Sequence, residues 1–66
     1  MNGELLRETI KAKGIKQVFV AEKVLHVTYP TFFQKLKGNS KFTLEESMAL
    51  KNFLGLTEEQ YDEIFG

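Results

Sequence analysis

The chain has 66 residues, 42% of them hydrophobic, with no Cys and no Trp. A chain of this length forms at most one domain, and without Cys it has neither a disulfide nor a Cys-ligated metal site. Its formal net charge is zero, which taken alone disfavours a nucleic-acid partner. The longest apolar run, Val18–Ala21, is far too short to cross a membrane, and the N-terminus lacks the apolar stretch of a signal peptide. We therefore expect one globular, cytoplasmic domain over residues 1–66.

The zero charge is an average over two parts of opposite sign. Residues 1–41 carry eight basic and three acidic residues, whereas residues 42–66 carry one basic and six acidic residues. Such an asymmetry is a hint that the basic part binds nucleic acid. Solvated helix faces, with Glu placed in first turns where the helix dipole favours it, explain the same distribution without any partner. Charge leaves both interpretations open.

Two helices are predicted in the first part of the chain. The segment Glu4–Lys13 places its apolar residues on one stripe, and Gly14 follows it at a position where helices commonly end. A second helix is predicted over Lys16–Leu25, where apolar residues recur at helical spacing and do not alternate as they would in a strand.

A third helix is predicted to begin at Tyr29 or Pro30 and to run to Lys37. Thr28 can cap this helix, and Pro30 suits a first turn because the missing N–H has no partner there anyway. Since a residue that precedes Pro avoids the helical region, Tyr29 is the alternative cap. Both starting points remain open.

Capping boxes predict the last two helices. Thr43 and Glu46 open a helix that runs to Leu54, and Thr57 and Gln60 open a final one. No segment has the pattern of a strand. The predicted fold is therefore all-α, a compact five-helix bundle.

Residues that could perform catalysis are scarce. His26 is the only histidine, so a His-pair metal site is impossible, and nucleophilic catalysis would need an orienting partner for it. The pairs Glu45–Glu46 and Glu58–Glu59 follow capping Thr residues, where the helix dipole favours acids. We expect no enzymatic activity, no cofactor, no metal and no small-molecule ligand.

Residues 17–38 have the pattern of a helix-turn-helix, with two short helices joined by a tight turn. Ala21 is small enough to let the two helices cross closely, while Phe32 and Leu36 lie four residues apart and are expected to face the core. In this motif the second helix enters the major groove of DNA by its N-terminal end.

The outward face of that second helix offers groups that can reach base edges. Gln34 can bond adenine with both amide atoms, and Phe33 can contact a thymine methyl. Packing of Phe33 against another helix or a dimer partner is the alternative. The base-contacting candidates are Tyr29, Thr31, Phe33, Gln34 and Lys37. The phosphate-contacting candidates are Lys16, Gln17, Asn39, Ser40 and Lys41, with Lys35 adding sequence-independent affinity if it lies beside the DNA backbone.

Motifs across about residues 4–56 carry a family resemblance. They are Gly14-Ile15-Lys16-Gln17, Ala21-Glu22-Lys23-Val24, Val27-Thr28-Tyr29-Pro30-Thr31-Phe32, Leu36-Lys37-Gly38 and Phe42-Thr43-Leu44-Glu45-Glu46. In these motifs the chain resembles the phage repressor and Cro, or XRE-type, helix-turn-helix family. The resemblance implies a lambda-repressor-like DNA-binding domain that binds palindromic operators as a dimer and controls phage or bacterial transcription. It places Gln17 near a phosphate, and it places these residues on the DNA-facing side of the recognition helix: Thr28, Tyr29, Pro30, Phe33, Gln34 and Lys37.

The chain departs from the family pattern at two points. The family usually has Gly four residues after Ala21, where this chain has Leu25. Counting back from the core residues of the third helix puts His26 at the Gly position, so the connection is one residue longer than usual and the recognition helix can shift by one. Lys16 replaces the Thr or Ser that commonly caps the second helix.

The leading hypothesis is a sequence-specific DNA-binding transcriptional regulator, a phage or prophage repressor of the Cro kind that occupies a palindromic operator on double-stranded DNA. We expect a homodimer formed through the C-terminal helix, although the same apolar face can instead close the monomer core. The candidate interface residues are Tyr61, Ile64 and Phe65. The alternatives are an antitoxin or autoregulator of a small operon, and a protein-interaction module that uses the acidic helix Glu58–Phe65 without DNA.

Overall fold

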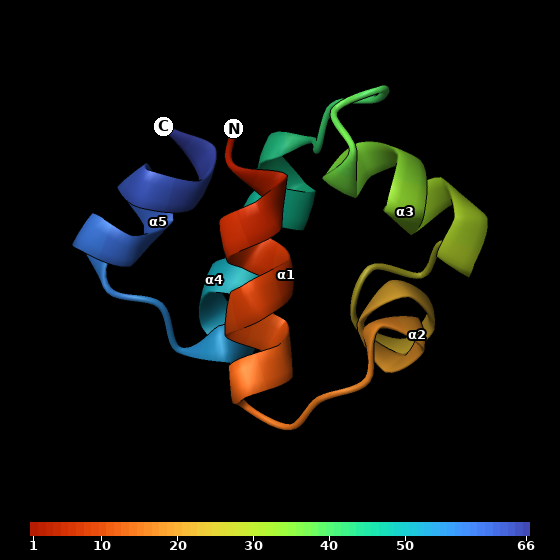
Figure 1. The fold of residues 1–66 in the computed structure, drawn as a ribbon, viewed down its shortest axis with the longest axis horizontal. Coiled ribbons are helices and arrows are strands. Elements are labelled where there is room, and N and C mark those ends of the chain that lie inside the picture. The colour runs from red at the N-terminus through yellow and green to blue at the C-terminus, as the bar shows by residue number, and fades with distance from the viewer.

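A computed structural model describes residues 1–66, and its regular elements are all helices (Figure 1). They are α1 (Gly3–Ala12), α2 (Gln17–Phe19), the π-helix η1 (Val20–Val24), α3 (Tyr29–Leu36), α4 (Leu44–Leu54) and α5 (Glu58–Phe65). α1 lies at the centre of the view, with α5 on one side and α2 and α3 on the other. The predicted all-α bundle is confirmed. None of its helices combines the length and the apolar character needed to span a bilayer.

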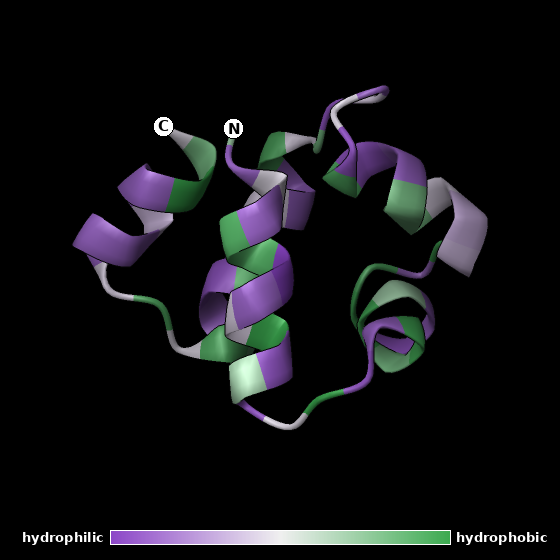
Figure 2. Cartoon of the chain, in the orientation of Figure 1, coloured by the Kyte–Doolittle hydropathy of each residue, from purple (hydrophilic) through white to green (hydrophobic).

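One apolar core joins the helices. Its members are Leu6, Ile10, Val20, Ala21, Leu25, Phe32, Leu36, Leu50, Leu54, Leu56 and Ile64. Figure 2 shows the amphipathic pattern on α1, where hydrophobic and hydrophilic bands alternate along the ribbon. Phe32 is fully buried and Leu36 is 9% exposed, so the prediction that both face the core is confirmed. Burying a side chain of this size contributes about 1.5–3 kcal/mol.

Side-chain caps determine where most helices begin. Thr43 and Glu46 form a complete capping box at the start of α4, and Thr57 and Gln60 form another at the start of α5. Both boxes are confirmed. Lys16 precedes α2 without any side-chain cap hydrogen bond, as its replacement of Ser or Thr predicts. Apart from the second helix, the predicted boundaries agree with the structure to within one residue.

The helix predicted over Lys16–Leu25 is present over residues 17–24, but its second half is a π-helix and not an α-helix. One turn of α-helix over Gln17–Phe19 continues as a π-helix over Val20–Val24. In this wider helix the Leu25 N–H donates to the Val20 carbonyl, five residues back, at 3.0 Å. A π-turn accommodates one residue more than an α-turn, so η1 takes up one residue more per turn than a regular helix would.

The turn that follows η1 fixes the start of α3. His26 has φ +57°, a left-handed conformation that is uncommon for a residue with a Cβ. It therefore occupies the backbone position where the family pattern has Gly. Thr28 then caps α3, with its Oγ1 accepting from the Thr31 N–H at 3.4 Å, and Tyr29 is the first helical residue. The alternative in which Tyr29 is the cap is wrong.

α1 and α3 meet at a close backbone contact. A Cβ built on Gly3 would lie 1.9 Å from the carbonyl oxygen of Leu36, a distance at which two heavy atoms overlap. Gly is therefore required at this point for the start of α1 to pack against the end of α3. The contact fixes the orientation of α3 relative to α1.

α5 turns its apolar face toward the monomer core. Ile64 is 1% exposed and belongs to the core of the single chain, so its contact with a second chain would require the bundle to open and stays a prediction. The Tyr61 hydroxyl is 2.8 Å from the Ser47 hydroxyl, and the Phe65 ring packs edge-on against Phe42 with centroids 5.8 Å apart. Tyr61 and Phe65 stay half-buried, and their role in a dimer stays a prediction.

Candidate nucleic-acid interface

One long side of α3 faces away from the core. Residues three or four apart share a helix face, so burial of Phe32 and Leu36 leaves the opposite face to solvent. Every residue predicted to contact bases is exposed: Thr28, Tyr29, Pro30, Thr31, Phe33, Gln34 and Lys37. Of the predicted phosphate-contacting residues, Lys16, Asn39, Ser40 and Lys41 are exposed, while Gln17 and Lys35 are half-buried.

Two aromatic rings dominate the N-terminal part of this face. Tyr29 and Phe33 stack with ring centroids 6.1 Å apart and an interplanar angle of 25°. They are 38% and 39% exposed. The Tyr29 hydroxyl donates to the Gln17 Oε1 at 3.4 Å, which ties the pair to the start of α2, and the Lys37 Nζ lies 5.4 Å from the centroid of the Phe33 ring. We call Tyr29 and Phe33 the aromatic plate.

Cationic hollows flank the aromatic plate at both ends. Residues that line the hollow at the Tyr29 end include Lys11, Lys16 and Gln17. The hollow at the Phe33 end is lined by Arg7 and Lys37 and also by the acidic Glu4, among others. The plate therefore lies between positive charges supplied by α1, by α3 and by the residue that precedes α2.

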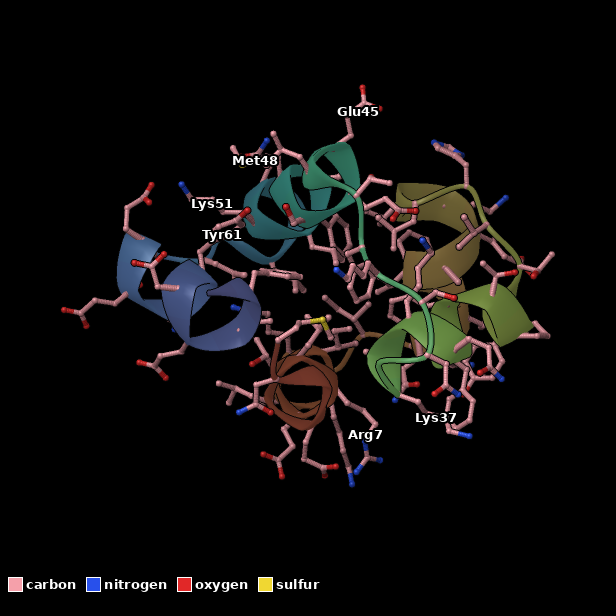
Figure 3. The ribbon with its side chains drawn as sticks, turned by 90° about the horizontal axis from the view of Figure 1, so that it is seen from above. Arg7, Lys37, Glu45, Met48, Lys51 and Tyr61 are labelled. Carbon is pink, nitrogen blue, oxygen red and sulfur yellow. The ribbon has the colours of Figure 1, made fainter.

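Sequence reasoning missed Arg7 and Lys11, because they belong to α1 and not to the helix-turn-helix. Both are exposed and four residues apart, so they share a helix face; that spacing was the available signal. In Figure 3, Arg7 and Lys37 project from one side of the molecule, while Glu45, Met48 and Lys51 lie toward the opposite side. The packing of α1 against α3 is what brings these distant cations together.

Arg7 also pairs with Glu4, its Nη2 lying 2.8 Å from the Glu4 Oε1. This hydrogen bond and the charge of Glu4 raise the pKa of Arg7 above its ordinary value, so the guanidinium is always charged. The two side chains are 47% and 68% exposed, and an ion pair this exposed contributes little to stability. A phosphate group can therefore compete with Glu4 for Arg7.

The amide of Gln34 is already hydrogen-bonded. Its Oε1 accepts from the Asn39 Nδ2 at 2.7 Å. The bidentate contact with adenine expected from the sequence needs this oxygen as an acceptor as well as the amide NH₂ as a donor. In the structure the NH₂ group is free, and the oxygen already accepts one hydrogen bond, from the side chain of Asn39.

Lys35 is engaged within the protein, and its contact with a phosphate stays a prediction. Its Nζ donates to the Glu46 Oε1 and to the Lys41 carbonyl, both at 3.0 Å, and the side chain is 12% exposed. Burial by itself would raise the pKa of Glu46, but the backbone N–H of Thr43 and the ammonium of Lys35 more than offset it, so the pKa is lowered. Lys35 instead ties α3 to α4 and anchors the loop that carries Asn39.

No protein-family model, curated protein or solved structure matches this chain. The family resemblance in its motifs therefore stays a prediction. The functional argument depends on the geometry of α3 and on the charges around it.

The charges complete the description of this face. The cations Arg7, Lys11, Lys16 and Lys37 are all exposed around the aromatic plate. α5 carries Glu58, Glu59, Asp62 and Glu63, also exposed. The protein is thus polarised despite its zero net charge, and such a distribution orients a molecule in the field of a polyanion.

Proposed function

We propose that the protein is a sequence-specific DNA-binding transcriptional regulator of the Cro repressor type, which inserts α3 into the major groove. The observation that carries this proposal is the exposed N-terminal half of α3 held between two groups of cations. A helix with its side chains is about 10–12 Å wide, which matches a major groove about 12 Å wide. Cations on both sides of an inserted helix then face the two phosphate backbones.

The connection between α2 and α3 supports a helix-turn-helix role. The π-helix η1 accommodates the additional residue, and the left-handed His26 reverses the chain in a tight turn. As a result, Gln17 at the start of α2 reaches Tyr29 at the start of α3. In the motif, the first helix crosses the DNA backbone while the second reads the groove.

The regulator would act in the bacterial cytoplasm by occupying an operator. In a homodimer, two copies of α3 would enter successive major grooves about 34 Å apart, and the operator would be palindromic. With Ile64 buried, the half-buried surfaces of Tyr61 and Phe65 are the parts of α5 left for such a contact.

The test is the salt dependence of binding to a duplex selected from random DNA. Exposed cations at the face are Arg7, Lys11, Lys16 and Lys37, so a dimer would make about eight phosphate contacts. Binding should then weaken about 10⁴-fold between about 50 and 200 mM salt. A response that is flat with salt contradicts the proposal.

A charge-matched pair of variants localises the contact. Lys37→Ala should weaken binding to all sequences and reduce the salt slope by about one per protomer. Lys51→Ala removes the same charge from α4, on the opposite side of the molecule (Figure 3), and should leave the slope unchanged once urea unfolding confirms that the variant is folded. Equal losses for the two variants would mean that α3 does not face the DNA.

A further inference from the structure

The aromatic plate is both exposed and rigid. Tyr29 is fixed at its far end by the hydrogen bond to Gln17, and Phe33 lies against Tyr29 on one side and near the Lys37 ammonium on another. Rings held in this way lose little conformational entropy when a partner covers them. They also present apolar surface to water, and a complex is stabilised when a partner removes that surface from solvent.

The polar groups on the outward face of α3 are partly engaged with one another, and the donors that stay free are the Gln34 NH₂, the Thr31 O–H and the Lys37 ammonium. The Gln34 carbonyl oxygen accepts from Asn39, and the Thr31 hydroxyl accepts from the Thr28 hydroxyl at 3.0 Å. Pro30 has no polar side chain, and α3 contains neither Arg nor Asn. Arg is the residue that most often recognises guanine through two hydrogen bonds. Beside these few donors, the face presents the apolar surface of two exposed rings, Tyr29 and Phe33.

The major groove of DNA presents one apolar group, the C5-methyl of thymine. Building on the proposed function, we infer that the aromatic plate reads thymine methyl groups, so that the preferred half-site carries thymine where Tyr29 and Phe33 meet the groove. The cations at both ends of the plate hold the phosphate backbones on either side and set the depth at which the rings lie. Specificity then comes from methyl contacts more than from hydrogen bonds.

The experiment replaces thymine by deoxyuridine, one position at a time, in the duplex selected from random DNA. Deoxyuridine lacks the methyl group and keeps every hydrogen-bonding atom of thymine. Removal of one contacted methyl should weaken binding about fourfold, the equivalent of burying one CH₂-sized group. Two or more neighbouring thymines in each half-site should show this loss.

The variant Phe33→Ala tests whether Phe33 is the residue that contacts the thymine methyl groups. This variant should bind the thymine site more weakly and should bind the thymine and deoxyuridine duplexes equally, because the contact is already lost. Phe33→Gln should behave in the same way and controls for the helix propensity of the replacement. The matched control is Phe53→Ala on α4, which removes a ring that is 41% exposed and that packs in a tilted arrangement against Phe19, with ring centroids 6.0 Å apart. It should keep the full deoxyuridine penalty.

The outcomes separate the inference from the proposed function. Specific, salt-dependent binding that is unaffected by deoxyuridine at every position overturns the inference and leaves the proposed function intact. An equal deoxyuridine penalty in the wild type and in Phe33→Ala also overturns it, because other residues would then read the methyl groups. A Phe33→Ala variant that changes only the oligomeric state assigns the plate to a protein contact instead. If no duplex is enriched and no salt-dependent binding occurs, the proposed function fails together with the inference.

Discussion

Replacing Lys35 by Met should destabilise the protein more than any other single loss of charge. The Lys35 Nζ makes two hydrogen bonds, to the Glu46 carboxylate and to the Lys41 carbonyl, both at 3.0 Å. Met keeps the length of the side chain and removes the charge. Hydrogen bonds to charged groups contribute about 1.5–3 kcal/mol each, and breaking a fully buried ion pair costs about 3–5 kcal/mol.

The partial burial of the pair sets the expected size of this loss. Lys35 and Glu46 are 12% and 15% exposed, so solvent screens part of the interaction. We expect Lys35→Met to lower the free energy of unfolding by about 2–3 kcal/mol. A domain of this length has a total stability of roughly 3–10 kcal/mol, so the urea midpoint should fall by about 2 M.

A double-mutant cycle isolates the pair itself. Glu46→Gln keeps a side chain that can accept from the Thr43 N–H, since Gln also completes a capping box, and should cost about 1–2 kcal/mol. The double variant should be less destabilised than the sum of the single variants by about 1–2 kcal/mol. Arg7→Met serves as the control, because the exposed Arg7–Glu4 pair should contribute little to stability. Additive losses would refute the reasoning.

The same pair predicts the direction of the pH dependence. Because the pKa of Glu46 is lowered in the folded protein from its ordinary value of 4.5, its ionisation stabilises the fold above that pH. This contribution disappears as the pH falls through the lowered pKa and the carboxylate becomes protonated. The difference in stability between wild type and Lys35→Met should therefore shrink as the pH falls below 4.5 and through the lowered pKa of Glu46. A difference that stays constant with pH would contradict the assignment.

Three further substitutions test the packing by urea unfolding. Gly3→Ala should cost about 1–3 kcal/mol, because the new Cβ overlaps the Leu36 carbonyl oxygen; unchanged stability would show that α1 and α3 do not approach this closely. His26→Gly should stabilise the protein by about 0.5–1 kcal/mol, since Gly tolerates the left-handed backbone at this position; a loss of stability would contradict that conformation. Ile64→Ala should lower the free energy of unfolding by about 2–5 kcal/mol, and this loss should be the same at all protein concentrations. A loss that depends on protein concentration would mean that Ile64 lies in a dimer interface.

Much of the fold was predictable because its signals are local. A capping box links residues three apart, so Thr43 with Glu46 and Thr57 with Gln60 mark helix starts without any knowledge of the rest of the chain. The burial of Phe32 likewise follows from the helical spacing of apolar residues. Such interactions form within one turn of helix, and the sequence specifies them directly.

The second helix shows where local signals stop being sufficient. Residues 16–25 have an ordinary helical pattern, and the surplus residue was detectable only by comparison with the family spacing. The packing of the core decides that the surplus residue lies inside η1. Val20 and Ala21 are both fully buried, and the turn at His26 must still allow α3 to pack against the core. Widening one turn of the helix satisfies both demands.

The candidate site depends both on local signals in the sequence and on the packing of the whole bundle. The sequence by itself determined which segments form helices, where the two capping-box helices start, and which residues of α3 face outward. The tertiary structure alone decided that Arg7 and Lys11 of α1 lie beside the aromatic plate, and that Ile64 belongs to the core. It also decided that Lys35 is withdrawn into a pair with Glu46, eleven residues away. The physical reason is distance along the chain: these contacts join different helices, and only the packing of the whole bundle brings their side chains together.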